Sequence, residues 1–288
     1  MRLVVTGAVG QLGHDLVLHA TDRGDDVVAA DRSVIDVTDR DEVLGAITSF
    51  RPDAVVNCAA WTAVDACESD PERAFAANGL AVRWVAEACD RVGAHLVHVS
   101  TDYVFDGTLD RPYQEWDETN PLGVYGRSKL AGEREALALG AGAGVVRTSW
   151  VCGANGANMV KTIMRLASDG DDTPGRLAFV DDQRGHPTMT ADLAPVLRRL
   201  ALDRRSGAHH VTNQGAVSWF EFAQAVVASM GRKPELVRPI ATAELDPPRP
   251  APRPANSVLD NAVLRAAGIP LLRDFREPLA ELVAALTS

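Results

Sequence analysis

The chain has 288 residues, of which 46% are hydrophobic and 24% are charged, and its formal net charge at pH 7 is −10. This length and composition are typical of a globular protein with one large α/β domain, or with a large domain and a smaller one. Nucleic-acid binding requires a basic face, so such an acidic chain is expected to have no nucleic-acid partner.

The cysteines give no sign of a metal site or a disulfide framework. Cys58, Cys67, Cys89 and Cys152 form no Cys-x-x-Cys pair and do not have the spacing of zinc ligands. Reduced thiols of this kind predict a cytoplasmic protein. The apolar run at the start of the chain is too short for a signal peptide or a membrane span, so we expect no membrane partner.

The first half of the chain alternates short apolar runs with helical patterns. The runs predict strands at Leu3–Thr6, Asp26–Asp31, Asp53–Ala59, Ala94–Ser100 and Gly144–Trp150. The segments between them predict helices at Gln11–Thr21, Asp41–Phe50, Pro71–Arg91 and Gly126–Leu139. Strands that are apolar almost throughout, separated by helices, indicate a parallel sheet covered on both faces, as in the Rossmann-like, doubly wound α/β fold.

The pattern loosens in the second half. Helices are predicted at Asn158–Ser168, Thr190–Leu202, Ser218–Met230 and Asn261–Ala267, and the proline-rich run Pro247–Pro254 is predicted as a loop. We therefore expect a dinucleotide-binding domain from residues 1–152 with parts of the C-terminal half. Residues 153–288 are expected to form mainly a smaller substrate-binding lobe over the C-terminal edge of the sheet, where ligands of open α/β sheets bind.

A glycine-rich turn follows the first strand and begins the first helix. Its glycines, Gly7, Gly10 and Gly13, permit a tight turn and a close approach of the backbone to a ligand. The free N–H groups at the start of the helix, together with the helix dipole, are predicted to bind the pyrophosphate of a nicotinamide dinucleotide.

The end of the second strand bears on the choice of cofactor. An acid such as Asp31 holds the 2′-hydroxyl of NAD, whereas an Arg such as Arg32 pairs with the 2′-phosphate of NADP. Both are present, so NADPH and NADH remain open. Asp36 is a candidate for the adenine amino group, or equally for a turn cap. The small residues around Cys58 let the backbone approach the ribose, or simply pack.

Three residues form a candidate catalytic set. Tyr125 and Lys129 are four residues apart on a predicted helix, so they share one face. An ammonium group beside a phenol lowers the pKa of the phenol, which favours proton exchange with a carbonyl oxygen. Thr101 ends the fourth strand, where its hydroxyl is placed to polarise the same carbonyl.

This order of motifs resembles the extended short-chain dehydrogenases, and more narrowly the family of dTDP-4-dehydrorhamnose reductases. The resemblance runs nearly end to end. It is carried by the glycine turn, Thr62–Asp65 with Glu68, His98–Gly107, Asn120–Glu133, Arg147–Trp150, Asp182–Thr188 and Arg253–Leu259. The stretches 98–107 and 125–133 are the specific ones, because the glycine turn occurs throughout the superfamily.

The resemblance implies NAD(P)H-dependent reduction of the 4-keto group of a nucleotide-linked deoxysugar, most simply dTDP-4-dehydro-L-rhamnose. It implies Thr101, Tyr125 and Lys129 as the catalytic triad. The cofactor is then expected to lie against Gly7, Gly10, Gln11, Leu12, Gly13, Asp31, Arg32, Asp36, Val37, Cys58, Ala59, Ala60, Thr62, Ser100, Tyr125 and Lys129. The substrate is expected to lie against Val64, Thr101, Asp102, Tyr125, Trp150, Arg253 and Asn256.

Some points stay open. Cys152 and Trp61 depart from the usual residues of the family beside the expected sugar pocket, which leaves the exact sugar open. Some relatives bind Mg²⁺, for which Asp15 and Asp182 are only weak candidates, and no metal site is predicted. The chain is expected to be a monomer or a homodimer. Trp150 is alternatively a core aromatic residue, and Arg253 a solvated residue of the proline-rich loop.

Competing functions differ in their motifs. Nucleotide-sugar 4,6-dehydratases carry Thr-Asp-Glu after the fourth strand, whereas this chain has Thr101, Asp102 and Tyr103, which argues against dehydration. Epimerases are usually longer. Two alternatives remain: a ketoreductase for another dTDP-deoxysugar of secondary metabolism, and a non-catalytic NADP-binding regulatory subunit with the same fold.

Overall fold

The computed structural model describes residues 1–138 and 142–287. Six parallel strands form its main sheet, in the order β10–β5–β4–β3–β1–β2. Their bounds are Arg2–Thr6 (β1), Asp26–Ala30 (β2), Ala54–Asn57 (β3), His95–Thr101 (β4), Ala143–Thr148 (β5) and Gly207–His210 (β10). The predicted fold class is confirmed. The strand order reverses beside β1, which opens a crevice at the carboxyl ends of β1 and β3.

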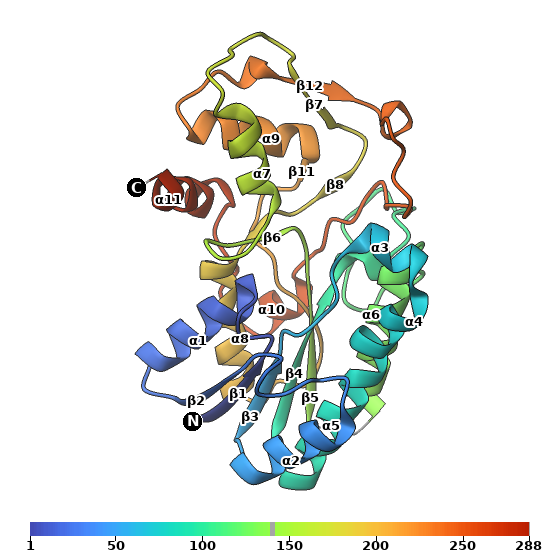
Figure 1. Cartoon of the computed structure of the whole chain (residues 1–288), viewed down its shortest axis with the longest axis vertical. Coiled ribbons are helices and arrows are strands. Elements are labelled where there is room, and N and C mark those ends of the chain that lie inside the picture. The colour runs from blue at the N-terminus through green and yellow to red at the C-terminus, as the bar shows by residue number, and fades with distance from the viewer. Residues whose placement is uncertain (139–141, 288) are drawn as a thin grey trace.

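Helices cover both faces of this sheet (Figure 1). One face carries α1 (Gln11–Asp22) and α8 (Thr190–Leu202), and the other carries α2 (Arg40–Phe50), α5 (Ala81–Val92) and α6 (Val124–Ala138). The last residue of the predicted helix Gly126–Leu139 lies outside the described residues. Side chains alternate along β1: Leu3 and Val5 pack under α1 and α8, while Val4 faces the opposite layer.

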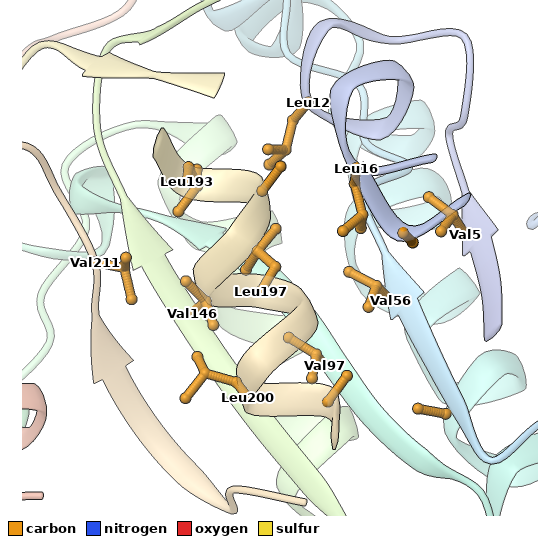
Figure 2. Packing of buried hydrophobic residues seen from close by; sticks show 14 of the residues in the cluster. Val5, Leu12, Leu16, Val56, Val97, Val146, Leu193, Leu197, Leu200 and Val211 are labelled. Atoms are coloured by element: carbon orange, nitrogen blue, oxygen red, sulfur yellow. The ribbon is translucent and has the colours of Figure 1, made fainter. Parts of the chain in front are cut away.

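Figure 2 shows how the first of these layers is filled. Leu193, Leu197 and Leu200 of α8 lie against Val97 and Val146 of the central strands. A helix and a strand from the second half of the sequence therefore complete the sheet domain. The predicted helix Thr190–Leu202 is confirmed, whereas β10 was not predicted.

The segment predicted as one helix, Pro71–Arg91, is divided. It consists of α4 (Pro71–Phe75), a π-helical turn over Ala76–Leu80, and α5. The widened turn contains Asn78, whose buried amide accepts from the N–H of Trp61 at 2.8 Å and donates to the Trp61 carbonyl and the Ser128 hydroxyl, both at 3.0 Å. The turn thus ties the segment before α3 (Val64–Ser69) to α6.

The remaining residues form a smaller lobe above the carboxyl edge of the sheet (Figure 1). Its helices are α7 (Met159–Ala167), α9 (Trp219–Ser229) and α11 (Arg276–Thr287), and α10 (Ala262–Ala266) contacts β10. Its strand pairs are β6–β9 (Val151–Cys152, Thr188–Met189), β7–β12 (Leu177–Val180, Val237–Ile240) and β8–β11 (Arg184–Gly185, Val217–Ser218). The lobe has its own core, which includes Ile163, Phe222, Val226, Phe275 and Leu279. Helix α11 was not predicted.

The proline-rich run 247–254 contains no helix or strand, as expected. None of the helices in the described ranges combines the length and the apolar character that crossing a membrane requires.

Candidate active site

A cavity of about 410 Å³ lies at the carboxyl ends of the central strands, beneath the smaller lobe. The walls bring together the three proposed catalytic residues, the glycine turn and residues of the lobe. They are formed by Gly7, Gly10, Gln11, Leu12, Gly13, Cys58, Ala60, Thr62, Val99, Ser100, Thr101, Asp102, Tyr125, Lys129, Thr148, Ser149, Trp150, Val151, Cys152, Ala157, Asn158, Met159 and Trp219.

The glycine turn is shaped for close contact with a ligand. Gly7 has a φ of +68°, which disfavours a side chain, and a Cβ on Gly13 would lie 2.2 Å from the Gly7 carbonyl oxygen. Gly10 caps α1 without a side-chain hydrogen bond, and the first turn of α1 contains no acidic residue. The first N–H groups of α1 therefore remain available for an anion such as a pyrophosphate.

Gln11 joins the glycine turn to the smaller lobe. Its Oε1 accepts from the N–H of Gly153 at 3.0 Å and from Nδ2 of Asn158 at 2.9 Å, and its Nε2 donates to the carbonyl of Ala157 at 3.2 Å. The loop between β6 and α7 is thereby fastened beside the first turn of α1. This role had no signal in the sequence, because the partners are more than 140 residues away.

Helix α6 presents Tyr125 and Lys129 to the cavity. The helix begins where Glu68 of α3 accepts from the N–H of Val124 at 2.7 Å. Lys129 is 2% exposed, and its Nζ donates to the carbonyl of Val99 at 2.7 Å and lies 3.5 Å from Nε2 of His98. The expectation that the two side chains share one face with Thr101 nearby agrees with this geometry.

Burial controls the proton affinities of both groups. It raises the pKa of the Tyr125 phenol above its ordinary value of 10.0, and the neighbouring Asp102 adds to the rise. The lowering of this pKa that was expected from Lys129 is therefore not found, because the loss of water around the phenol dominates. Burial also lowers the pKa of Lys129 to about 8, against the influence of Glu133 and Cys58.

Asp102 is a buried carboxyl group on the cavity wall. It is 2% exposed, its Oδ1 accepts from the Thr101 hydroxyl at 3.0 Å, and its Oδ2 receives no hydrogen bond from the described residues. Burial raises its pKa to about 7, although hydrogen bonds with Ser257 and Thr101 oppose the rise. A group that changes charge near neutral pH therefore lies beside Thr101 and Tyr125.

The residues after β2 lie outside this cavity wall. The Asp31 carboxylate accepts from the hydroxyl of Ser33 at 2.6 Å and from the N–H of Ser33 at 2.8 Å, and these two bonds lower its pKa. Arg32 is exposed and donates to Asp36 at 3.0 Å, while Asp36 also accepts from Thr38. The turn-capping alternative for Asp36 is thus realised, and its contact with adenine stays a prediction.

A second cavity of about 220 Å³ shares Met159 and Trp219 with the first. Arg253 lines it, as do Tyr103 and Arg249. The Arg253 guanidinium forms two hydrogen bonds with Asp65, at 2.5 and 2.9 Å. The alternative prediction, that Arg253 is a solvated residue of the proline-rich loop, is wrong. Its side chain is largely buried and forms an ion pair with Asp65.

Several residues that were predicted to contact the cofactor or the substrate lie away from the first cavity. Val64, Ala59 and Val37 do not line the first cavity. Asn256 donates to the carbonyls of Leu109 and Arg111 at 2.8 and 3.0 Å and accepts from Val258, so its amide fastens loops together.

Ser100 and Trp150 do lie on the cavity wall. The Ser100 hydroxyl donates its proton to Glu133 at 2.5 Å, so the side chain has no proton left to donate to a cofactor. Trp150 stacks on Trp219 with ring centroids 3.6 Å apart and an interplanar angle of 10°.

The two weak metal candidates have other partners. Asp15 on α1 accepts a hydrogen bond from the Thr190 hydroxyl, and Asp182 accepts from Thr242 at 2.6 Å. Among the residues of the two described ranges, no group of three or more His, Cys, Asp or Glu side chains is placed to hold a metal ion.

Sequence reasoning missed Met159, Trp219 and Asn158 as cavity residues. All three come from the lobe, where the helical pattern gives no information on which side chains face the sheet. The Ser218–Glu221 capping box marks the start of α9, beside Trp219, but gives no sign of a site.

Comparison with known proteins identifies the family of the chain. The RmlD substrate binding domain family model matches residues 1–288. A dTDP-4-dehydrorhamnose reductase of Streptomyces griseus is 45% identical over 99% of this chain and 94% of its own length.

Two solved structures are similar over almost the whole chain. The crystal structure of a dTDP-4-dehydrorhamnose reductase from Clostridium acetobutylicum has a TM-score of 0.94 at 38% identity and covers 100% of both chains. The dTDP-4-dehydrorhamnose reductase from Bacillus anthracis in complex with NADP has a TM-score of 0.93 at 35% identity and covers 99% of both chains. The chain therefore belongs to the RmlD family of dTDP-4-dehydrorhamnose reductases, with the fold of the extended short-chain dehydrogenases.

Proposed function

We propose that the protein reduces the 4-keto group of dTDP-4-dehydro-L-rhamnose with a nicotinamide cofactor, giving dTDP-L-rhamnose. The observation that carries the proposal is the convergence of Thr101, Tyr125 and Lys129 on the cavity that the glycine turn also lines. Residues 1–152, with α8 and β10, hold the cofactor. Most of residues 153–288 form the lobe that covers the sugar.

Each catalytic side chain has one role. The bound cofactor supplies the hydride. Tyr125 donates its phenolic proton to the carbonyl oxygen as negative charge develops there, and its raised pKa keeps that proton in place at neutral pH. Thr101 donates a hydrogen bond to the same oxygen. Lys129, held by the carbonyl of Val99, offers its remaining N–H groups to the ribose of the cofactor.

NADPH is the preferred cofactor in this proposal. Arg32 is exposed after β2, and among the described residues its guanidinium is paired with the carboxylate of Asp36, an exposed contact that it can exchange for a 2′-phosphate. Asp31 is already bonded to Ser33 and Val34, which leaves it less available to a 2′-hydroxyl. The NADP complex of the Bacillus anthracis relative supports this choice.

The nucleotide part of the substrate occupies the second cavity. The Arg253 guanidinium lies there beside Arg249 and Tyr103, and an arginine fork matches the geometry of a diphosphate. Trp219 and Met159, which both cavities share, separate the sugar from the nucleotide.

The first experiment mixes the purified protein with freshly generated dTDP-4-dehydro-L-rhamnose and NADPH and follows the absorbance of the reduced nicotinamide. We expect rapid oxidation of NADPH and dTDP-L-rhamnose as the product. Oxidation only with a different dTDP-ketosugar would assign the protein to another deoxysugar. Cofactor binding without oxidation by any ketosugar would indicate a regulatory subunit and overturn the proposal.

The same assay tests the cofactor preference. Replacing Arg32 with Ala removes a charged partner of the 2′-phosphate, so KM for NADPH should rise by about tenfold or more. The KM for NADH, which lacks that phosphate, should change little. An equal change for both cofactors would contradict this role of Arg32.

A further inference from the structure

The Thr101 hydroxyl has more hydrogen-bond partners than it has protons. A hydroxyl group carries one proton to donate and two lone pairs to accept with. In the structure, Oγ1 of Thr101 accepts from the N–H of Tyr103 at 3.2 Å and donates to Oδ1 of Asp102 at 3.0 Å. The Tyr125 phenol is also nearby, and the Thr101 hydroxyl acts to lower the pKa of that phenol against the effect of burial. The single proton of Thr101 is thus directed at Asp102.

This arrangement conflicts with polarisation of the ketone while Asp102 is ionised. A carboxylate only accepts hydrogen bonds, and a bond to a charged oxygen is stronger than one to a neutral carbonyl. The Thr101 proton therefore stays on the carboxylate. The substrate oxygen then receives a hydrogen bond from Tyr125 alone.

A neutral Asp102 removes the conflict. Its own O–H donates to Oγ1 of Thr101 across the same 3.0 Å separation, so the direction of that hydrogen bond is reversed. Oγ1 then accepts from Asp102 and from the N–H of Tyr103, which fills its two lone pairs. The Thr101 proton and the Tyr125 proton are both free for the ketone.

We propose that Asp102 is a positioning residue for the reduction, whose neutral carboxyl directs the Thr101 hydroxyl at the ketone and whose carboxylate draws that hydroxyl away. This inference rests on the proposed function, and it adds that the rate of the reduction depends on pH through Asp102. Asp102 exchanges no proton with the substrate; it acts through Thr101.

The surroundings of Asp102 favour the neutral form. Burial raises its pKa to about 7, and Oδ2 receives no hydrogen bond from the described residues to stabilise a charge. The titratable groups nearby are Tyr103 in the same turn and Tyr125 and Lys129 on α6. On the C-terminal loop, Arg253 acts on Tyr103 and is paired with Asp65, and Ser257 is neutral. As the pH rises through about 7, Asp102 ionises and the rate should fall.

The test compares kcat of the wild-type protein with that of Asp102→Asn, with NADPH and saturating ketosugar, between about pH 6 and 8.5. The amide of Asn donates to Thr101 at every pH. The ratio of the Asp102→Asn rate to the wild-type rate should therefore rise by about tenfold or more over this range, as expected for one lost donor to a developing oxyanion. Titration of Lys129 affects both proteins and cancels in the ratio.

Two controls make the ratio specific. In a Thr101→Val background, adding Asp102→Asn should leave the ratio flat, because the hydroxyl that Asp102 directs is missing. Asp110→Asn, which changes an exposed carboxylate of the loop that follows β4, should match the wild type at every pH. A flat ratio in the Thr101 protein, or an equal rise in the Thr101→Val background, would overturn the inference.

A second measurement avoids the substitution of Asp102 if that variant does not fold. Infrared difference spectra of the NADPH-bound wild-type protein should show a buried carboxyl group that ionises at the same pH as the fall in kcat. A fall in kcat with no carboxyl ionising at that pH would contradict the inference. Absence of turnover at every pH would count against the proposed function instead.

Discussion

Tyr125 and Lys129 illustrate how burial changes single residues. Each has lost most of its contact with water, and each shifts toward its neutral form, so the pKa of the phenol rises and that of the ammonium falls. In a reduction the neutral phenol is the form that can donate a proton. The two shifts therefore prepare Tyr125 as an acid and bring Lys129 to the edge of ionisation at neutral pH.

Replacing Tyr125 with Phe removes the proposed acid but keeps the ring. We expect kcat to fall by a factor of about 10² to 10⁴, with NADPH binding almost unchanged. Steady-state kinetics and fluorescence titration with NADPH measure the two quantities. Tyr113→Phe, which removes a buried phenol outside the cavity, is the control and should reduce kcat much less. Unchanged turnover of Tyr125→Phe would exclude Tyr125 as the acid.

Lys129 also affects stability, and the sign follows from its lowered pKa. Between the folded value of about 8 and the ordinary value of 10.5, the unfolded chain binds more protons than the folded protein. The free energy of unfolding of the wild type should therefore rise with pH in this window relative to Lys129→Met, by an amount on the order of 3 kcal/mol. Denaturant titrations of both proteins between about pH 7 and 10.5 measure the difference. If the difference in the free energy of unfolding between the two proteins does not change with pH, the pKa of Lys129 is not lowered by burial in the folded protein.

At the scale of elements, helix α6 is fixed on either side of the segment that contains Tyr125 and Lys129. Glu68 binds its first turn, and a buried ion pair fastens its middle to β5. Arg147 binds Glu133 through Nε at 3.0 Å and Nη2 at 2.7 Å. Close approach is possible because Gly126 lacks a side chain, since a Cβ there would lie 2.2 Å from the Tyr103 carbonyl oxygen. The turn with Thr101 and the helix with Tyr125 are thereby held in contact.

Breaking this pair should be costly. Arg147→Met leaves the Glu133 carboxylate buried without its partner and should lower the free energy of unfolding by about 3 to 5 kcal/mol. Arg83→Met is the matched control, because Arg83 pairs with Glu135 of the same helix at 2.7 Å but is half exposed. Its loss should cost less than about 1 kcal/mol. Equal losses in denaturant unfolding would contradict the special role of the buried pair.

At the scale of the whole molecule, the cavity lies between a sheet domain and a lobe that are joined by several polar links, such as those of Asn155 with His14 and of Arg253 with Asp65. Gln11 provides three of them, to Gly153, Ala157 and Asn158. These three bonds fasten the loop of residues 153–158, which lines the cavity, beside the glycine turn.

Replacing Gln11 with Ala should loosen the loop of residues 153–158 without unfolding the sheet. Since the Gly153 amide loses its acceptor, its hydrogen exchange should accelerate by about fivefold to tenfold, the effect of roughly 1 kcal/mol. Amides of β1 and β4 should keep their rates. Gln224→Ala on α9 is the control, because this glutamine donates to the carbonyl of Pro234 within the lobe. Faster exchange throughout the sheet would mean that Gln11 supports global stability instead.

The sequence alone determined the features that depend on neighbouring residues. The glycine turn, the first five strands, the pairing of Tyr125 with Lys129 on one helix face, and the position of Thr101 at a strand end all follow from local spacing. These were enough to predict the fold class, which the structure confirms. The family was predicted from the resemblance of longer stretches such as 98–107 and 125–133, and the comparisons confirm it.

Only the tertiary structure decided the features that depend on residues far apart in the chain. Strand β10 joins the sheet although its sequence, Gly207–His210, has no alternating apolar pattern. The π-helical turn at Asn78 depends on Trp61 and Ser128, and the cavity walls at Met159 and Trp219 depend on how the lobe sits over the sheet. The state of Asp102 belongs to the same class. The pKa of a carboxyl group depends on how much water and which donors surround it, and a linear pattern of residues does not contain that information.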